Sequence, residues 1–303
     1  VIDRSILLTA KEAFFSSGMP GTAINLKNFH LAKAYMGQVA VPDDGMRRCI
    51  LNMLDAAEVS DAISNKSNEM LVKGAIQKGY MGPLAGFDLF ESATLPTHTV
   101  GAYGGTPLTA GANQTGDTIQ TDGWTASVTG LLKAGDVIQF AGVHEINPQN
   151  YSSTGRLKHF VVQEDVNSDA GGLATIKISP AINDGKQTTT NQEGDTISTK
   201  AYQNVDAAPA DNAAITVLGS PDTTYRENFL FHRDAIALAM VDLELPQSAT
   251  VKSRVRDPDS GLSLSMTGAY DINEQSEITR IDAVWGAHMI YPELAHRMWS
   301  AEG

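Results

Sequence analysis

The chain has 303 residues, of which 42% are hydrophobic and 19% are charged, and its formal net charge is −13. This length and composition are ordinary for a folded protein of one large or two medium domains, and they exclude a chain that is disordered throughout. The acidic balance argues against a surface that binds nucleic acid by neutralising phosphates, because such a surface needs clustered lysine and arginine. The sequence shows neither a secretory signal peptide nor an apolar run near the ~18 residues of a membrane span, so we expect a cytoplasmic product.

Residues 1–91 are predicted to combine helices with one strand. Asn25 and Asn52 each precede an apolar pattern of helical spacing, so both are expected to be N-caps. Asp55, in the first turn after Asn52, suits the positive end of a helix. Gly18 and Pro20 end the first helical pattern. The predicted elements are helices at about 3–17, 26–37, 52–63 and 68–79, and a strand at 47–53.

None of the residue patterns points to catalysis, a metal site or a cofactor. Cys49 is the single cysteine, which excludes an internal disulfide, and its apolar surroundings predict a buried thiol. Asp43 and Asp44 form an acidic pair, but the order Pro-Asp-Asp-Gly is typical of a turn and no third ligand follows in register. The histidines are scattered, and the chain contains no HExxH, GxSxG or phosphate-binding glycine motif. We therefore expect a protein that is not an enzyme.

Residues 92–222 are rich in Thr, Gly, Asn and Asp and contain short apolar runs that alternate with polar residues. Ala174, Ile176 and Ile178 alternate with Thr175 and Lys177, which places the three apolar side chains on one face of a strand. Several short strands separated by turns predict a small barrel or sandwich. The expected strands are at 124–129, 136–143, 158–164, 174–179 and 213–218, and the expected flexible loops are at 101–118 and 185–199.

The segment from Tyr225 to Trp299 falls into three pieces. The first, RENFLFHRDAIALAMVDLELP, is apolar, stops at Pro246 and predicts a buried strand or a short helix. The second, VKSRVRDPDSGLSLSMTGAYDI, is polar and rich in turn residues. The third, ITRIDAVWGAHMIYPELAHRMW, mixes large apolar residues with scattered charges.

The order of these three pieces resembles the end of the major coat proteins of tailed double-stranded DNA bacteriophages. It is most similar to the podovirus-type branch, which carries an extra domain inserted in the Hong Kong 97-like capsid fold. Upstream, VPDDGMRRCILNMLDAAEVSDAI resembles the segment that enters the axial domain of that fold, and LAGFDLFESATLPTHTVG resembles the lead into the inserted domain.

The resemblance implies an α+β fold with axial and peripheral domains, interrupted by an inserted small β-barrel or sandwich. It implies that residues 3–17 end the long spine helix, so that the N-terminal arm and the extended loop of the family would lie before Val1. The implied parts are the first part of the capsid core at 1–91, the inserted β-rich domain at 92–222 and the second part of the core at 223–303.

The same resemblance implies a structural protein, a major capsid subunit that assembles with itself into an icosahedral shell of hexamers and pentamers around double-stranded DNA. A shell with a negatively charged wall is compatible with enclosed DNA, because such a wall repels the DNA and does not bind it. The implied partners are a scaffolding protein, a portal and a decoration protein, with no cofactor and no membrane. The implied location is the virion capsid, assembled in the host cytoplasm.

The polar second piece and the start of the third piece hold the candidate site residues. Charges of both signs beside a proline-containing turn are able to form ion pairs between subunits, and arginine–carboxylate pairs also define geometry. The alternative is a solvated hairpin loop whose charges only maintain solubility. The candidate residues for contacts between subunits are Arg254, Arg256, Asp257, Asp259, Arg280 and Asp282.

Two other functions were compared with the capsid hypothesis. One is a β-rich module that binds carbohydrate or a host surface, as in a phage tail. An aromatic content of 7% with three Trp weakens that hypothesis. The other is a hydrolase whose catalytic residues follow none of the motifs above.

Overall fold

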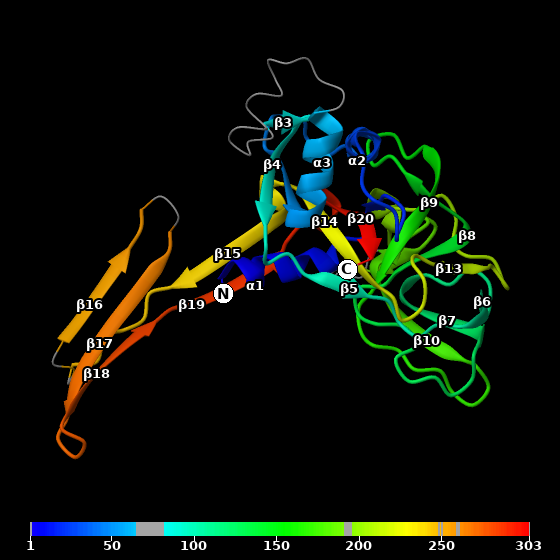
Figure 1. Cartoon of the computed structure of the whole chain (residues 1–303). Helices are drawn as coiled ribbons and strands as arrows, with labels where there is room; N and C mark the ends of the chain where they lie inside the picture. The colour runs from blue at the N-terminus through cyan, green and yellow to red at the C-terminus, as the bar shows by residue number, and fades with distance from the viewer. Residues whose placement is uncertain are drawn as a thin grey trace.

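The computed structural model describes residues 2–64, 82–190, 196–247, 249, 251–258 and 261–302. The helix predicted at 68–79 lies outside these residues. Within them the structure is mostly β, and its α-helices lie in the first part of the chain. Figure 1 shows a central sheet with helices beside it, a separate group of strands on one side, and an arm of three strands on the other.

A seven-stranded mixed sheet forms the central part, in the order β1-β20-β14-β2-β4-β3, with β5 also paired to β14. The pairing of β14 with β2 is antiparallel, and that of β2 with β4 is parallel. Alternate residues of β2 are buried, and Cys49 is fully enclosed as predicted. The strands are β1 (Ser16–Ser17), β2 (Arg47–Asn52), β3 (Pro83–Leu84), β4 (Phe87–Ser92), β5 (Thr97–Thr99), β14 (Thr224–His232) and β20 (Ala295–Glu302).

The helices α2 (Leu26–Gln38) and α3 (Met53–Ser64) begin where the sequence predicts. The Asn25 side chain accepts a hydrogen bond from the Asn28 backbone N–H at 3.3 Å, and Asn52 accepts one from Leu54 at 3.1 Å. Each cap satisfies an amide that has no partner within the helix. The two cap predictions are confirmed.

The helix predicted at 3–17 is shorter than expected. Helix α1 spans Ile2–Leu8, a 3-10 turn follows at Thr9–Glu12, and the chain is then extended into β1. The neighbouring rings of Phe14 and Phe15 are both buried. The backbone N–H of Arg297 donates to the carbonyl oxygen of Phe15 at 2.8 Å, so pairing with the distant strand β20 replaces the local helical bonds.

Gly18 directly follows β1 at a place where a side chain would not fit. Its φ is +82°, and a Cβ built there would lie 2.5 Å from the backbone oxygen of Trp299. Gly37 of α2, in contrast, has no atom within 4 Å of a built Cβ.

Substitution of Gly18 with alanine is expected to reduce the free energy of unfolding by about 2 kcal/mol or more, because the backbone of β20 would have to move. The matched control Gly37→Ala should be neutral or stabilising by up to about 1 kcal/mol, since alanine favours a helix. Urea unfolding of both variants measures the difference, and equal stabilities would contradict this account.

A second, six-stranded sheet occupies residues 105–217, in the order β13-β8-β9-β10-β7-β6. A bridge between Leu108 and Ala214 joins its two outer edges, which closes the sheet into a barrel. Ala174, Ile176 and Ile178 face the interior as predicted. The strands are β6 (Gly105–Thr109), β7 (Gly116–Trp124), β8 (Val137–Ile146), β9 (Ser153–Val162), β10 (Ala174–Ile182) and β13 (Ile215–Val217).

Three predictions for this part are wrong in detail. Residues 124–129 do not form the expected strand. Strand β7 ends at Trp124, and the chain then turns through Ser127, whose φ is positive. The loop expected at 101–118 contains β6, and the loop expected at 185–199 contains the paired strands β11 (Thr188–Thr190) and β12 (Thr196–Ser198). Threonine packs well in strands, so threonine-rich segments pair where glycine had indicated flexibility.

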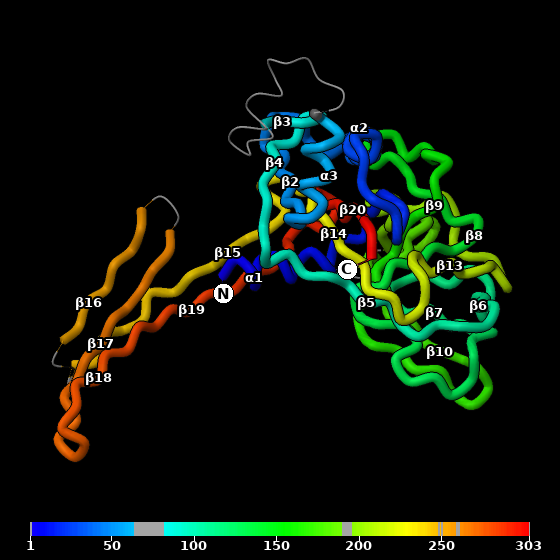
Figure 2. The backbone as a smooth tube through the Cα atoms, viewed as in Figure 1, coloured from blue at the N-terminus to red at the C-terminus, as the bar shows by residue number. Residues whose placement is uncertain are grey.

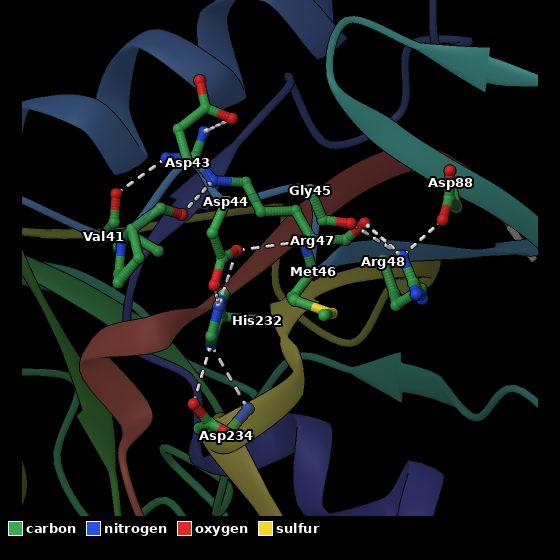
Figure 3. A network of polar contacts seen from close by, with 11 residues as sticks. Val41, Asp43, Asp44, Gly45, Met46, Arg47, Arg48, Asp88, His232 and Asp234 are labelled. Atoms are coloured by element: carbon green, nitrogen blue, oxygen red, sulfur yellow. Dashed lines mark hydrogen bonds and ion pairs between the residues drawn. The ribbon is translucent and has the colours of Figure 1, made fainter.

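The turn before β2 is held by polar contacts, as Figure 3 shows. Asp44 accepts hydrogen bonds from the Met46 backbone N–H at 3.0 Å and from His232 Nε2 at 3.1 Å. The bond from Met46 contributes most to lowering the pKa of Asp44, and His232 adds to it. Arg47 donates to backbone oxygens of the same turn, and Arg48 pairs with Asp88. Asp43 and Asp44 thus belong to a turn, as predicted.

Candidate assembly surface

The arm is a three-stranded antiparallel sheet. Its first two strands lie in the segment that the sequence marks as polar and turn-rich, and its third strand lies just beyond that segment. Its strands are β16 (Val251–Arg256), β17 (Ser263–Asp271) and β18 (Ser276–Asp282). Figure 2 shows it set apart from the rest of the chain and joined to it by the paired strands β15 (Ile236–Val241) and β19 (Val284–Met289). The apolar run before Pro246 therefore forms strands, and its second half leads into the arm.

One face of the arm collects most of the candidate residues. Arg254 pairs with Ser265, which pairs in turn with Asp282, so these side chains share a face. By the same register, Arg256 and Arg280 lie on that face too. The structure thus brings together four of the six residues. Asp257 lies in the turn after β16, and Asp259 lies outside the described residues.

The arginines of this polar face have partners within their own chain. Arg256 Nη1 lies 3.5 Å from Asp242, and Arg254 Nη1 donates to the backbone oxygen of Leu243 at 3.3 Å. Arg280 Nε donates to Asp282 at 2.6 Å. The side chains of Arg256 and Arg280 are 57% and 75% exposed, so each ion pair contributes at most about 1 kcal/mol.

The segment 242–247 therefore lies along the polar face and partly covers it. Ser263 and Ser265 are buried there, although serine is usually exposed. A hydrogen bond from Ser263, and then the charges of Arg256 and Arg254, lower the pKa of Asp242. The hydrogen-bonding and charged groups of the polar face thus largely have partners within the single chain.

The opposite face of the arm is apolar and exposed. Val255 pairs with Leu264, and Met266 pairs with Ile281, so the alternation of each strand places them together. Val255 and Ile281 are each 67% exposed, and Leu264 is 51% exposed. A contiguous apolar surface of this kind marks a site of interaction. The large apolar side chains of this face, which we call the apolar face, are Val251, Val255, Leu264, Met266, Tyr270 and Ile281. By the same register Ser253, Thr279 and Glu277 share the face with them.

Sequence reasoning placed the candidate contacts on charged residues and did not single out the apolar face. The signal was present in the order V-K-S-R-V-R, which alternates apolar and polar residues with the period of a strand, and in the order L-S-L-S-M. The proline and glycine at 258–261 drew attention to a turn, but they only join β16 to β17.

The described residues contain no group of three or more acidic, histidine or cysteine side chains that would hold a metal ion. Among the same residues, no helix is long and apolar enough to cross a membrane.

Comparison with known proteins points to the shell-forming proteins of phages. One relative is the major capsid protein of Acyrthosiphon pisum secondary endosymbiont phage 1, with 27% identity over 171 residues. The match covers 54% of this chain and 37% of that relative, so this chain corresponds to well under half of the relative's length.

Two solved structures are similar. The CUS-3 coat protein I-domain has 24% identity and a TM-score of 0.25, and the match covers 39% of this chain and 98% of that one. The capsid of Cyanophage P-SCSP1u has 10% identity and a TM-score of 0.39, and that match covers 99% of this chain and 60% of the other.

The class defined by these findings is a structural subunit of a phage shell, whose working surfaces are contacts with other subunits. The family model described as "P22 coat protein - gene protein 5" matches residues 20–298. The chain therefore belongs to the P22 coat protein family, and it is a major capsid subunit. The family implies a structural role, as the sequence predicts.

Proposed function

We propose that this chain builds an icosahedral shell of hexamers and pentamers that encloses double-stranded DNA, and that the arm joins neighbouring copies. The observation that carries this proposal is the apolar face, which projects on a separate arm and is left open to water within the single chain. Burying such side chains contributes about 1.5–3 kcal/mol each, and the gain repeats at every copy of the contact.

The finer architecture belongs to the same proposal. Residues 1–91 and 223–303 form the α+β capsid core of a Hong Kong 97-like fold, and residues 92–222 form the inserted domain. The barrel supports most of this division because its strands lie within 105–217 and pair only with one another among the described named strands. Strand β5, although it lies within 92–222, pairs with β14 of the central sheet. A scaffolding protein, a portal and a decoration protein are the proposed partners, and the host cytoplasm is the proposed place of assembly.

The polar face is assigned a smaller part in these contacts. Arg254, Arg256, Arg280 and Asp282 are exposed enough to form ion pairs with a neighbour at the rim of the apolar contact. Asp257, which follows β16, and Asp259 belong to the same proposed contact. Rim charges of this kind select the orientation of a partner more than they strengthen its binding.

Lysine substitutions on the apolar face test the proposal. Val255→Lys and Ile281→Lys should leave the stability of the unassembled subunit within about 1 kcal/mol, because both side chains are mostly exposed there. Assembly should fall at least tenfold, since each contact would bury an unpaired charge. Shell yield is measured by sedimentation.

The matched control is Thr175→Lys, which places the same charge on the exposed face of barrel strand β10. Shells should form from this variant at the yield of the unsubstituted chain. Normal shell yield from Val255→Lys and Ile281→Lys would show that the apolar face is not a contact between copies.

A further inference from the structure

A cavity of about 470 Å³ lies between the barrel and the start of α2. Its wall combines residues that are far apart in the sequence. Side chains of the core meet side chains of barrel strands β8 and β9 there. The polar residues on the wall include Ser16, Ser17, Asn25, Asn28, Arg156 and His159.

Several polar atoms in and behind this wall are buried without a hydrogen-bond partner. On the wall these are Ser17 Oγ, in a residue that is 7% exposed, and Nε and Nη1 of Arg156. Arg297 Nε, Trp299 Nε1 and both ring nitrogens of His296 lie in the adjoining strand β20. All of these groups except one ring nitrogen of His296 are able to donate a hydrogen bond. Among the described residues, the groups left without a partner in and behind this wall are therefore almost all donors.

The charges around the cavity are also unbalanced. Arg156 and Lys158 share the buried carboxylate of Glu145, and Arg297 pairs with Glu227. Three basic side chains thus share two buried carboxylates. Burial lowers the pKa of Lys158 and Glu145 opposes that shift, so the basic groups exceed the carboxylates by one.

The groups nearest to this excess charge do not neutralise it. Glu293 also acts on Lys158, but it is exposed and screened by solvent. Burial, followed by Arg156, Lys158 and Arg297, lowers the pKa of His159 to about 3, so this histidine is neutral and adds no charge.

The N-terminal end of α2 adds a positive electrostatic field that favours a bound anion. This helix has 13 residues and no acidic residue in its first turn, and Asn25 and Asn28 place that turn at the cavity. The N-terminus of a helix attracts anions because its amide groups point outward and its dipole is positive there.

We propose that this cavity binds a small oxyanion of the phosphate class. The anion accepts hydrogen bonds from Ser17 and Arg156, balances the excess positive charge and is held beside the first turn of α2. The site joins the barrel to the core, so occupancy stabilises the contact between them. The proposal is independent of shell assembly and is tested on the unassembled chain.

The test is the thermal unfolding of the chain with increasing inorganic phosphate at pH 7.5, compared with sodium chloride at equal ionic strength, together with calorimetric titration of phosphate. Phosphate should raise the unfolding temperature in the manner of a ligand that binds one site, beyond any effect of chloride. The absence of a phosphate-specific shift would overturn the proposal.

Two variants locate the site. Ser17→Ala should weaken phosphate binding about five- to tenfold, yet it should not destabilise the phosphate-free chain, because the hydroxyl has no partner there. Arg156→Lys keeps the charge beside Glu145 and loses the planar donor group, and a similar loss is expected. Lys186→Gln, on an exposed loop, is the control and should bind like the unsubstituted chain. Unchanged phosphate binding in both site variants would place the anion elsewhere and overturn the assignment.

Discussion

Replacing Asp55 with alanine is expected to lower the free energy of unfolding by about 3–5 kcal/mol, since it removes one partner of a buried ion pair. The Asp55 side chain is fully buried, and Oδ1 lies 3.2 Å from Arg226 Nη1. It also accepts hydrogen bonds from Asn228 at 2.6 Å and from Ser300 at 2.8 Å. The carboxylate thus connects helix α3 to strands β14 and β20 of the central sheet.

Among the described residues, the ion pair left to Arg226 would be the one with Glu58, whose side chain is 37% exposed and 3.6 Å away. Chemical denaturation of the unassembled subunit measures the loss. The matched control is Asp117→Ala on the exposed start of β7, which should change stability by less than about 0.5 kcal/mol. A cost of Asp55→Ala below about 1 kcal/mol would mean that the buried pair does not hold the core.

Stability is expected to fall when the pH drops from 7.5 to 5.5, because two histidines must stay uncharged in the fold. Burial, together with nearby Arg156 and Arg297, lowers the pKa values of His159 and His296. Each folded pKa lies below the unfolded value near 6.5, so the unfolded chain binds more protons once the pH falls below about 6.5. The contribution of the two neutral histidines to the free energy of unfolding is therefore fully present above that pH. It declines as the pH falls towards the folded pKa, which is about 3 for His159.

For each fully buried histidine, the free energy of unfolding falls by about 1.4 kcal/mol between pH 7.5 and 5.5. His296 is fully buried, whereas His159 lies at the wall of a cavity, so we expect a combined loss between about 1.4 and 2.7 kcal/mol. The variant His296→Phe fills the same space without titrating, and its loss should be about 1.4 kcal/mol smaller. The control His288→Gln, at an exposed position, should show the loss of the unsubstituted chain. An identical pH profile for His296→Phe would contradict the assignment.

Local signals predicted several elements correctly. Asn25 and Asn52 cap α2 and α3 through bonds to residues two or three positions away, so the sequence contains the whole interaction. The alternation around Ile176 predicts a barrel strand for the same reason, because one buried face determines it.

The elements that could not be predicted depend on distant partners. Phe14 and Phe15 leave the helical pattern because β20, far along the chain, offers both a core and a backbone partner. Asp55 has the position of a helix-terminal charge, but its partners Arg226, Asn228 and Ser300 come together only in the fold. The sequence predicts candidate contacts in the part of the chain that forms the arm, while the apolar face of the arm depends on the register of three strands.

The central claim is that the chain forms a closed shell through repeated contacts between copies. Particle size against protein concentration tests it most directly, by sedimentation velocity with negative-stain microscopy on the full-length product, with and without a candidate scaffolding protein. Closed shells, or rings of five and six subunits, are the predicted result. A monomer or a small oligomer at every concentration, with the scaffolding protein present, would contradict the account.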